Sequence, residues 1–205
     1  MGMDKPSCFE GCYYFLKLHS VPLFLIFTSL LVALFSDDAA LFLRYERTEI
    51  LNFEFWRLFT AHIVHSGYEH LFLNLFALII TWLITYRFAN RFDWWFTLLL
   101  SSFGISLSFL LFMSNLEWYV GLSGVLHSLV VFGSISAILQ SRKEFYLLFF
   151  FTFLKLVFEQ FYGQVSKDFI WIESPVIVNA HLYGAIMGII CAAILWIYKK
   201  VIKST

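Results

Sequence analysis

The sequence predicts an all-α membrane protein in which six transmembrane helices form one bundle. Three observations favour this class. First, 60% of the 205 residues are hydrophobic, 21% are aromatic and only 14% are charged, whereas a soluble domain averages about 25% charged residues. Second, the mean hydropathy is +0.79, as expected when lipid is the solvent for most side chains. Third, the apolar residues are gathered into six long segments.

Each of these segments is about as long as a helix that crosses a membrane. At 1.5 Å per residue, about 20 residues cover the ~30 Å of hydrocarbon in a bilayer. Because lipid offers the backbone no partners, each segment must satisfy its own N–H and C=O groups as an α-helix. We expect helices, in chain order, at residues 20–35, 70–87, 94–113, 121–139, 145–163 and 176–198.

The remaining stretches define the predicted organisation of the chain. Residues 1–19 form a short N-terminal arm, residues 20–198 the six-helix domain, and residues 199–205 a basic tail. No small-residue cleavage signal follows the first span, so we expect it to be retained. The connection 36–69 mixes acidic and aromatic residues, which predicts short amphipathic helices lying in the outer interface.

Basic residues are divided unevenly between the two sides of the predicted bundle. With both termini on one side, that side holds Lys5, Lys17, Arg87, Arg91, Arg142, Lys143, Lys199, Lys200 and Lys203. The opposite side holds only Arg44, Arg47, Arg57 and Lys167. Loops rich in Lys and Arg stay in the cytoplasm, so we expect both termini to be cytoplasmic.

The three cysteines indicate free thiols rather than a disulfide or a metal site. Cys8 and Cys12 lie on the predicted cytoplasmic arm and Cys191 within the last span. A reducing compartment disfavours disulfides, and the pair at residues 8 and 12 has no further Cys or His nearby. We expect no metal and no cofactor, and the sequence contains no sign of a nucleic-acid surface.

Several polar residues lie inside the predicted spans. Burying an ionisable group in lipid costs free energy, so such residues indicate a structural or functional role. Ser123 opens the fourth span and His127 follows one turn later. His70 and Asn74 share one face of the second span at i, i+4. In the last span, His181 shares a face with two glycines, at residues 184 and 188, and small residues at this spacing let another helix approach closely.

This set of residues supplies the parts that acyl transfer requires. Ser123, near a helix N-terminus and flanked by Gly121 and Gly124, is a candidate nucleophile. His181 is a candidate general base, and His70 and Asn74 are candidate donors to an oxyanion. No Asp or Glu is evidently placed to complete a triad, so we expect a Ser–His dyad. Taken alone, Ser123 is more typical of a weak hydrogen-bond partner between helices, whereas His70 with Asn74 fits an interhelical hydrogen-bonding pair as well as a functional one.

The motifs that carry these residues resemble those of the rhomboid family of intramembrane serine proteases. WRLFTAHIVHSGYEHLFLN (residues 56–74) is similar to the family's Trp-Arg loop element followed by its His-x-x-x-Asn helix. GLSG (121–124) is similar to the nucleophile motif Gly-x-Ser-Gly, and AHLYG (180–184) to Ala-His-x-x-Gly in the last helix. The motifs occur in register with the predicted spans, and the resemblance extends over nearly the whole chain.

The resemblance implies a rhomboid-like bundle with an intramembrane protease site. Ser123 would be the nucleophile and His181 the base, while His70, Asn74 and the Ser123 backbone N–H would form the oxyanion hole. Trp56 and Arg57 would brace the outer loop, and His65 would be a structural or water-organising residue. The implied substrates are single-span membrane proteins. The implied location is the bacterial inner membrane, with the active site opening to the periplasmic side.

GLSGVLH and the compact six-span core look most like the rhombosortase branch, whose substrates end in Gly-Gly, an apolar span and a basic tail. The fate of the acyl group, water or an amine, is left open. Where rhomboids commonly place a bulky aromatic one turn after the nucleophile, this chain has His127. We favour His181 as the base, with His127 as a packing or tuning group. If His127 were the base, His127→Ala would abolish activity while His181→Ala would not.

Lys155 and Glu159 form an i, i+4 pair inside the fifth span. They are either a structural ion pair or a polar wall of the substrate entry gate.

Two other functions remain possible on the sequence alone. A histidine-rich haem or metal binder would show an absorbance band or tightly bound metal, and a non-catalytic rhomboid-like chaperone would be expected to lack the serine or the histidine. The oligomeric state is left open.

Overall fold

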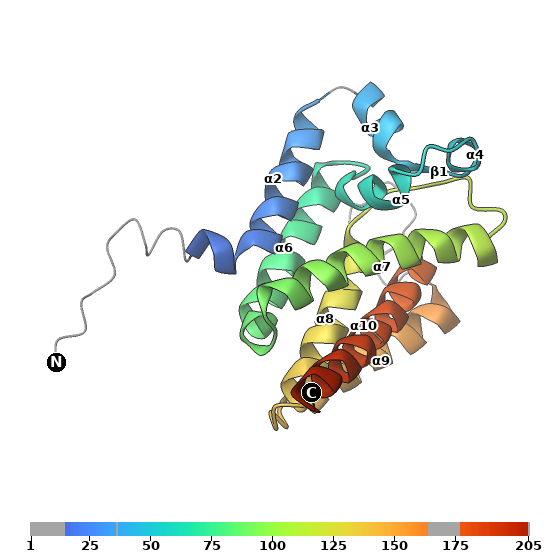
Figure 1. Cartoon of the computed structure of the whole chain (residues 1–205). Helices are drawn as coiled ribbons and strands as arrows, with labels where there is room; N and C mark the ends of the chain where they lie inside the picture. The colour runs from blue at the N-terminus through green and yellow to red at the C-terminus, as the bar shows by residue number, and fades with distance from the viewer. Residues whose placement is uncertain (1–14, 36, 164–176, 205) are drawn as a thin grey trace.

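The computed structural model describes residues 15–35, 37–163 and 177–204. Within these ranges the chain is a bundle of helices (Figure 1), with one two-residue strand pair. Four of the residues used in the sequence argument, Lys5, Cys8, Cys12 and Lys167, lie outside the described residues.

Six long helices form the bundle, and each matches one of the predicted segments. They are α2 (Ser20–Leu34), α6 (Tyr68–Thr85), α7 (Arg91–Phe112), α8 (Ser123–Ile138), α9 (Phe145–Tyr162) and α10 (Val178–Ser204). The prediction of an all-α six-helix bundle is confirmed. The last helix continues through residues 199–204, so the stretch expected to be a tail extends α10 in the structure.

The helices differ in length more than the sequence suggested. By length and composition, four can cross a membrane: Tyr68–Phe88 (α6 with the 3₁₀ turn η2, Tyr86–Phe88), Arg91–Phe112, Phe145–Tyr162 and Val178–Ile202. The other two, α2 and α8, have 15 and 16 residues. At 1.5 Å per residue, α8 is about 24 Å long, shorter than the hydrocarbon layer. Gly121 and Leu122, which precede Ser123, are buried, so α8 begins inside the bundle rather than at its edge.

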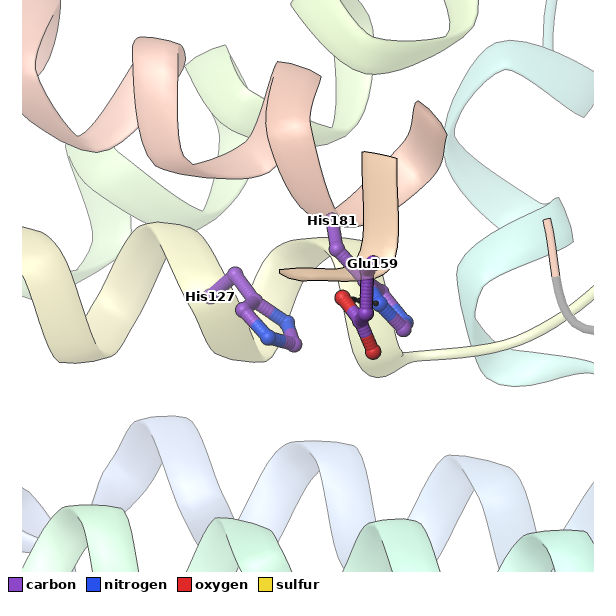
Figure 2. A group of neighbouring side chains, drawn as sticks. All are labelled: His127, Glu159 and His181. Carbon is purple, nitrogen blue, oxygen red and sulfur yellow. Dashed lines mark hydrogen bonds and ion pairs between the residues drawn. The ribbon is translucent and has the colours of Figure 1, made fainter. Parts of the chain in front are cut away.

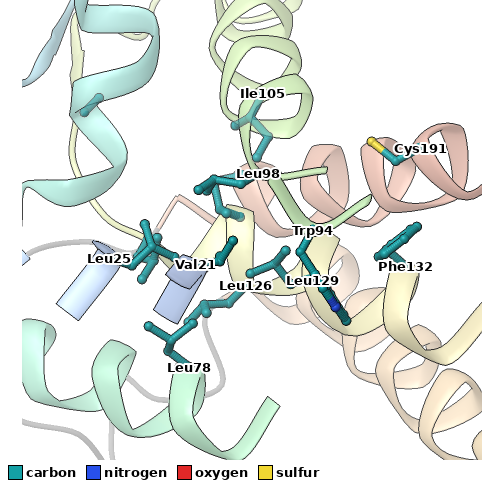
Figure 3. Packing of buried hydrophobic residues seen from close by; sticks show 14 of the residues in the cluster. Val21, Leu25, Leu78, Trp94, Leu98, Ile105, Leu126, Leu129, Phe132 and Cys191 are labelled. Atoms are coloured by element: carbon teal, nitrogen blue, oxygen red, sulfur yellow. The ribbon is translucent and has the colours of Figure 1, made fainter. Parts of the chain in front are cut away.

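The core of the bundle lies where α2, α6, α7, α8 and α10 converge (Figure 3). Its side chains are aliphatic and aromatic and almost fully buried, among them Leu25, Leu78, Trp94, Ile105 and Phe132. Trp94 packs edge-on against Phe132 of α8, with ring centroids 5.1 Å apart. This packing surrounds α8 on several sides and therefore holds its first turn in place.

Short helices fill the connection between α2 and α6, as the composition predicted. They are α3 (Asp37–Leu43), α4 (Arg47–Leu51), α5 (Arg57–Thr60) and the 3₁₀ turn η1 (Ala61–Ile63). Strand β1 (Tyr45–Glu46) in this connection pairs antiparallel with β2 (Trp118–Tyr119), just before α8. The connection is thereby tied to the loop that leads to Ser123.

Helices α8 and α10 approach each other so closely that only glycine fits at their crossing. A Cβ on Gly184 of α10 would collide with the backbone carbonyl of Gly124. A Cβ on Gly124 would lie 2.9 Å from the Ala180 carbonyl oxygen, and one on Gly188 would lie 2.6 Å from the Ser128 carbonyl oxygen. The predicted contact face of α10 is therefore confirmed, and it sets His181 directly against the start of α8.

The two ends of the bundle have different compositions. In Figure 1 the short helices α3 to α5 gather at one end and the C terminus lies at the other. The second end is held together by Gln140 donating to the Phe88 carbonyl at 2.7 Å and by the ion pair of Lys199 with buried Asp93. The basic residues near it are Arg87, Arg91, Arg142, Lys143, Lys199 and Lys200.

Candidate active site

The site begins with the turn that leads into α8. Gly121 has φ +129°, a conformation that side-chain-bearing residues rarely adopt. The buried Tyr119 hydroxyl donates to the Gly121 carbonyl at 2.8 Å, and the Gly121 N–H donates to the Ala61 carbonyl at 3.1 Å. These bonds fix the direction in which the chain enters α8, so Ser123 occupies the first residue of the helix.

Ser123 and His181 meet across the α8–α10 crossing. The distance from Ser123 Oγ to His181 Nε2 is 3.0 Å, a normal hydrogen-bond length. The histidine is 58 residues away along the chain and buried. Their contact depends on the glycine crossing one turn further along α10, because a wider separation of the helices would move the imidazole out of reach.

Glu159 of α9 lies on the other side of the imidazole. Its Oε2 is 2.9 Å from His181 Nδ1, and both side chains are buried. The expectation that no carboxylate stands beside the histidine is wrong. A helical period places Glu159 one turn from Lys155, but only the packing of α9 determines which neighbour that face meets.

Lys155 and His127 complete a polar cluster around the same carboxylate. Lys155 Nζ is 2.7 Å from Glu159 Oε1 and 3.0 Å from His127 Nε2. His127 Nδ1 is 2.7 Å from the Ser123 carbonyl oxygen, which can only accept, so the proton of a neutral His127 lies on Nδ1. Figure 2 shows His127, Glu159 and His181 together; the two imidazoles are stacked, with centroids 4.3 Å apart.

Three of these residues also form a possible metal-ligand group. One ligand atom from each of His127, Glu159 and His181 lies within 4.8 Å of the others. The Lys155 ammonium contacts both Glu159 and His127. A positive charge of the protein thus already neighbours these two potential ligands. A metal at this position would have to displace Lys155 and the Glu159–His181 hydrogen bond.

Ser123 opens into a cavity of about 310 Å³ that His70 also lines. Ser66 Oγ lies 3.0 Å from His70 Nδ1. With this hydroxyl as the donor, the His70 proton lies on Nε2. A Cβ on Gly121 would lie 3.0 Å from His70 Nε2, so glycine keeps this N–H accessible.

Asn74, the second predicted oxyanion donor, is placed differently. Its Nδ2 donates to the His70 carbonyl of its own helix at 3.0 Å, and the residue is buried. Asn74 is not among the residues that line the cavity. One of its two amide N–H groups remains for another partner, so its role as a donor stays a prediction.

The predicted supporting residues Arg57 and Trp56 make their contacts within the outer connection. Arg57 is buried, pairs with Glu54 at 2.6 Å and donates to the Leu41 and Arg44 carbonyls at 2.7 and 3.0 Å. Trp56 Nε1 donates to the Phe42 carbonyl at 3.3 Å. The interactions of both residues thus join α5 to α3 and its C-terminal flank.

The imidazole of His65 packs against that of His70, which lines the cavity beside Ser123, with ring centroids 5.1 Å apart. Burial lowers the pKa of His65 to about 3. Both of its buried nitrogens lack a hydrogen-bond partner within the described residues. The role of His65 stays a prediction.

A family model of the rhomboid domain matches residues 52–198. This chain belongs to the rhomboid family. Members of the family are generally intramembrane serine proteases, and the chain has the apolar helices of a multi-pass membrane protein. No curated protein matches the chain.

Sequence reasoning missed two features of the rhomboid site. The first is Tyr119, whose hydroxyl donates to the Gly121 carbonyl two residues before Ser123; an aromatic residue close before GLSG was the available signal. The second is the contact of Glu159 with His181, for which a buried acid on an otherwise apolar helix was the signal.

Proposed function

We propose that this rhomboid protein is an intramembrane serine endopeptidase that cleaves single-span membrane proteins. The 3.0 Å contact between Ser123 Oγ and His181 Nε2 is the observation that carries the proposal. It brings together a hydroxyl and an imidazole from two different helices, beside a cavity. A nucleophile within hydrogen-bond reach of a base is the arrangement that covalent acyl transfer needs.

The reaction follows from the positions of the two groups. Ser123 Oγ attacks the substrate carbonyl carbon while its proton passes to His181 Nε2. The tetrahedral intermediate collapses, its C–N bond breaks, and the same proton moves from Nε2 to the departing amine. Water then attacks the acyl-enzyme, giving one proton to His181 and releasing the acid, and His181 returns that proton to Ser123 Oγ.

The developing oxyanion would lie at the start of α8. The Ser123 backbone N–H would donate to it, and the helix dipole favours negative charge there. His70, which shares the cavity with Ser123, would add a donor from Nε2. Loss of one such donor costs on the order of 10²–10³-fold in rate. Asn74 would contribute only if its remaining N–H turns to the cavity.

The substrate is proposed to be a rhombosortase-type signal in which Gly-Gly precedes an apolar span and a basic tail. Ser123 contacts the buried His181 inside the bundle, so the cleaved segment of the substrate would have to unwind to reach it. Glycine weakens a helix by about 1 kcal/mol per residue relative to alanine, so a Gly-Gly pair makes this unwinding easier. The small residue also suits the cavity beside Ser123, which His70, Tyr119 and Val120 line.

The proposed location is the bacterial inner membrane, with the site open to the periplasm. The end of the bundle opposite the short helices carries the basic residues near Lys199 and Gln140. Loops rich in Lys and Arg remain cytoplasmic, so this end would face the cytoplasm. Maleimide labelling of single cysteines introduced at Lys200 and at Phe53 in a cysteine-free protein tests the orientation: only the second should react in intact spheroplasts.

Fluorophosphonate labelling of detergent-purified protein tests the chemistry. Wild type should label, and Ser123→Ala and His181→Ala should not. Ser128→Ala is the matched control, because it removes another buried hydroxyl from α8 that has no hydrogen-bond partner in the described residues. An active rhomboid labelled in parallel controls the reagent. Absence of labelling in folded wild type would refute the proposal and favour a non-catalytic chaperone or a metal binder.

Cleavage of a reporter tests the substrate. A fusion carrying Gly-Gly, an apolar span and a basic tail should be cut in proteoliposomes, and the Leu-Leu version should be cut at least tenfold more slowly. Mass spectrometry of the product in the presence of hydroxylamine distinguishes hydrolysis from transfer to an amine. Equal cleavage of both fusions would contradict the Gly-Gly assignment.

A further inference from the structure

Helix α9 buries very little of itself, and one of the few side chains it buries is charged. Its buried residues are Phe145, Leu156 and Glu159. A carboxylate in an apolar setting is unfavourable unless it is paired and hydrogen-bonded. Lys155 lies on the same helix, so its ion pair with one Glu159 oxygen could form whichever way that face of α9 were turned. The second oxygen is instead directed to His181 Nδ1 at 2.9 Å.

We propose that Glu159 is a positioning residue that completes a Ser123–His181–Glu159 triad, and that Lys155 holds its carboxylate in place. This rests on the proposed protease function and goes beyond the dyad expected from the sequence. Glu159 acts on the reaction through His181 and does not touch the substrate. Its partner Lys155 occupies Oε1, which leaves Oε2 for the imidazole.

The contact selects the productive tautomer of His181. A carboxylate accepts hydrogen bonds only, so Nδ1 must carry the proton. The lone pair of a neutral His181 therefore lies on Nε2, which faces Ser123 Oγ at 3.0 Å. When Nε2 takes the serine proton, the imidazole becomes a cation with both nitrogens protonated, and Glu159 remains an anion beside it. Stabilising this cation lowers the barrier to attack.

The same network assigns His127 to support rather than to catalysis. Its Nδ1–H donates to the Ser123 carbonyl and its Nε2 accepts from Lys155. Neither nitrogen is free to take a proton from Ser123 Oγ. Stacking of its ring on His181 at 4.3 Å holds the plane of the base. His127 thus fixes the orientation of His181 while Glu159 fixes its tautomer.

Lys155 makes the role of Glu159 testable by a double variant. In Glu159→Gln, the Lys155 ammonium needs an acceptor and would take the amide oxygen. The amide NH₂ would then face His181 Nδ1 and force its proton onto Nε2, the unproductive tautomer. In Glu159→Gln with Lys155→Met, the amide can turn its oxygen to Nδ1 again. The second substitution should therefore restore activity that the first removes.

Cleavage kinetics of the reporter in proteoliposomes provide the test. Glu159→Gln should lower kcat by about 10²–10⁴-fold, as for other triad orienting groups, with KM within about twofold of wild type. Adding Lys155→Met should raise kcat at least tenfold above the single variant. Thr152→Val is the control on α9, because Thr152 donates only to its own helix at the Leu148 carbonyl. An unchanged kcat in Glu159→Gln, or a double variant no faster than the single, would overturn the proposal.

A measurement on folded wild type keeps the test independent of the variants and of activity. The ¹⁵N NMR spectrum of histidine-labelled protein in bilayers reports which ring nitrogen is protonated. His181, assigned by comparison with His181→Gln, should show a protonated Nδ1 and a bare Nε2 in the resting enzyme. A bare Nδ1 would overturn the triad even if the protein cleaves its substrate. Conversely, failure of wild type to label with fluorophosphonate would refute the protease function, while a protonated Nδ1 would still support the Glu159–His181 contact.

Discussion

Replacing Gly184 by alanine tests whether the α8–α10 crossing sets the geometry of the site. A Cβ at this position would collide with the Gly124 carbonyl, which belongs to the backbone and cannot rotate away. Carbon and oxygen need roughly 3.2–3.5 Å between them, so the two helices must separate by about 1 Å or more. His181 lies one turn before Gly184 on α10 and must move with it.

The size of the effect follows from the hydrogen bond that this movement stretches. The distance from Ser123 Oγ to His181 Nε2 would grow from 3.0 Å to about 4 Å, which is no longer a hydrogen bond. A misplacement of about 1 Å in a catalytic group costs on the order of 10²-fold in rate. Overpacking should also lower the free energy of unfolding by about 1–3 kcal/mol.

Fluorophosphonate labelling rate and thermal unfolding in detergent, measured on the same samples, give both quantities. Gly104→Ala is the matched control: its Cβ would also meet α10, but at the Met187 thioether, the flexible end of a side chain that can move aside. Gly184→Ala should label about 10²-fold more slowly, and Gly104→Ala near the wild-type rate. Wild-type labelling and stability in Gly184→Ala would refute the idea that close backbone contact positions the base.

Three further outcomes follow from other contacts. Burial lowers the pKa of His62 from 6.5 to about 4, so between these values the unfolded state binds more protons. The free energy of unfolding should fall by about 1.4 kcal/mol per pH unit as the pH drops from 6.5 to 4. The Tm of His62→Leu should depend less on pH over the same range. His127→Phe keeps a ring against His181 and should retain most of the labelling rate, whereas His127→Ala should lose at least tenfold of it. The Arg57 guanidinium donates to a carboxylate from Nε and to two carbonyls from Nη1. Arg57→Lys places all donors on one nitrogen, which cannot reach the three acceptors together, and should destabilise the protein by about 1–3 kcal/mol, visible as a lower Tm.

The spans could be predicted closely because lipid imposes a simple rule on the sequence. Every backbone group must be satisfied inside the segment, so a long apolar run is a helix. The position of His181 on the contact face of α10 could also be predicted, since two glycines share its helical face at residues 184 and 188. Helix ends were less accurate: α8 begins at Ser123 and not at residue 121, because Gly121 is held in a turn by Tyr119 and Ala61.

What the sequence determined by itself was therefore the six long helices, their approximate ends and the residues that carry the family motifs. Helical periodicity also placed Lys155 and Glu159 on one face of α9, as a pair. It could not say what that face meets, because the partner of a helix face depends on how separate helices pack. Only the tertiary structure directs one Glu159 oxygen to His181 and the other to Lys155. Contacts between helices that are distant along the chain decide this, and no local pattern encodes them.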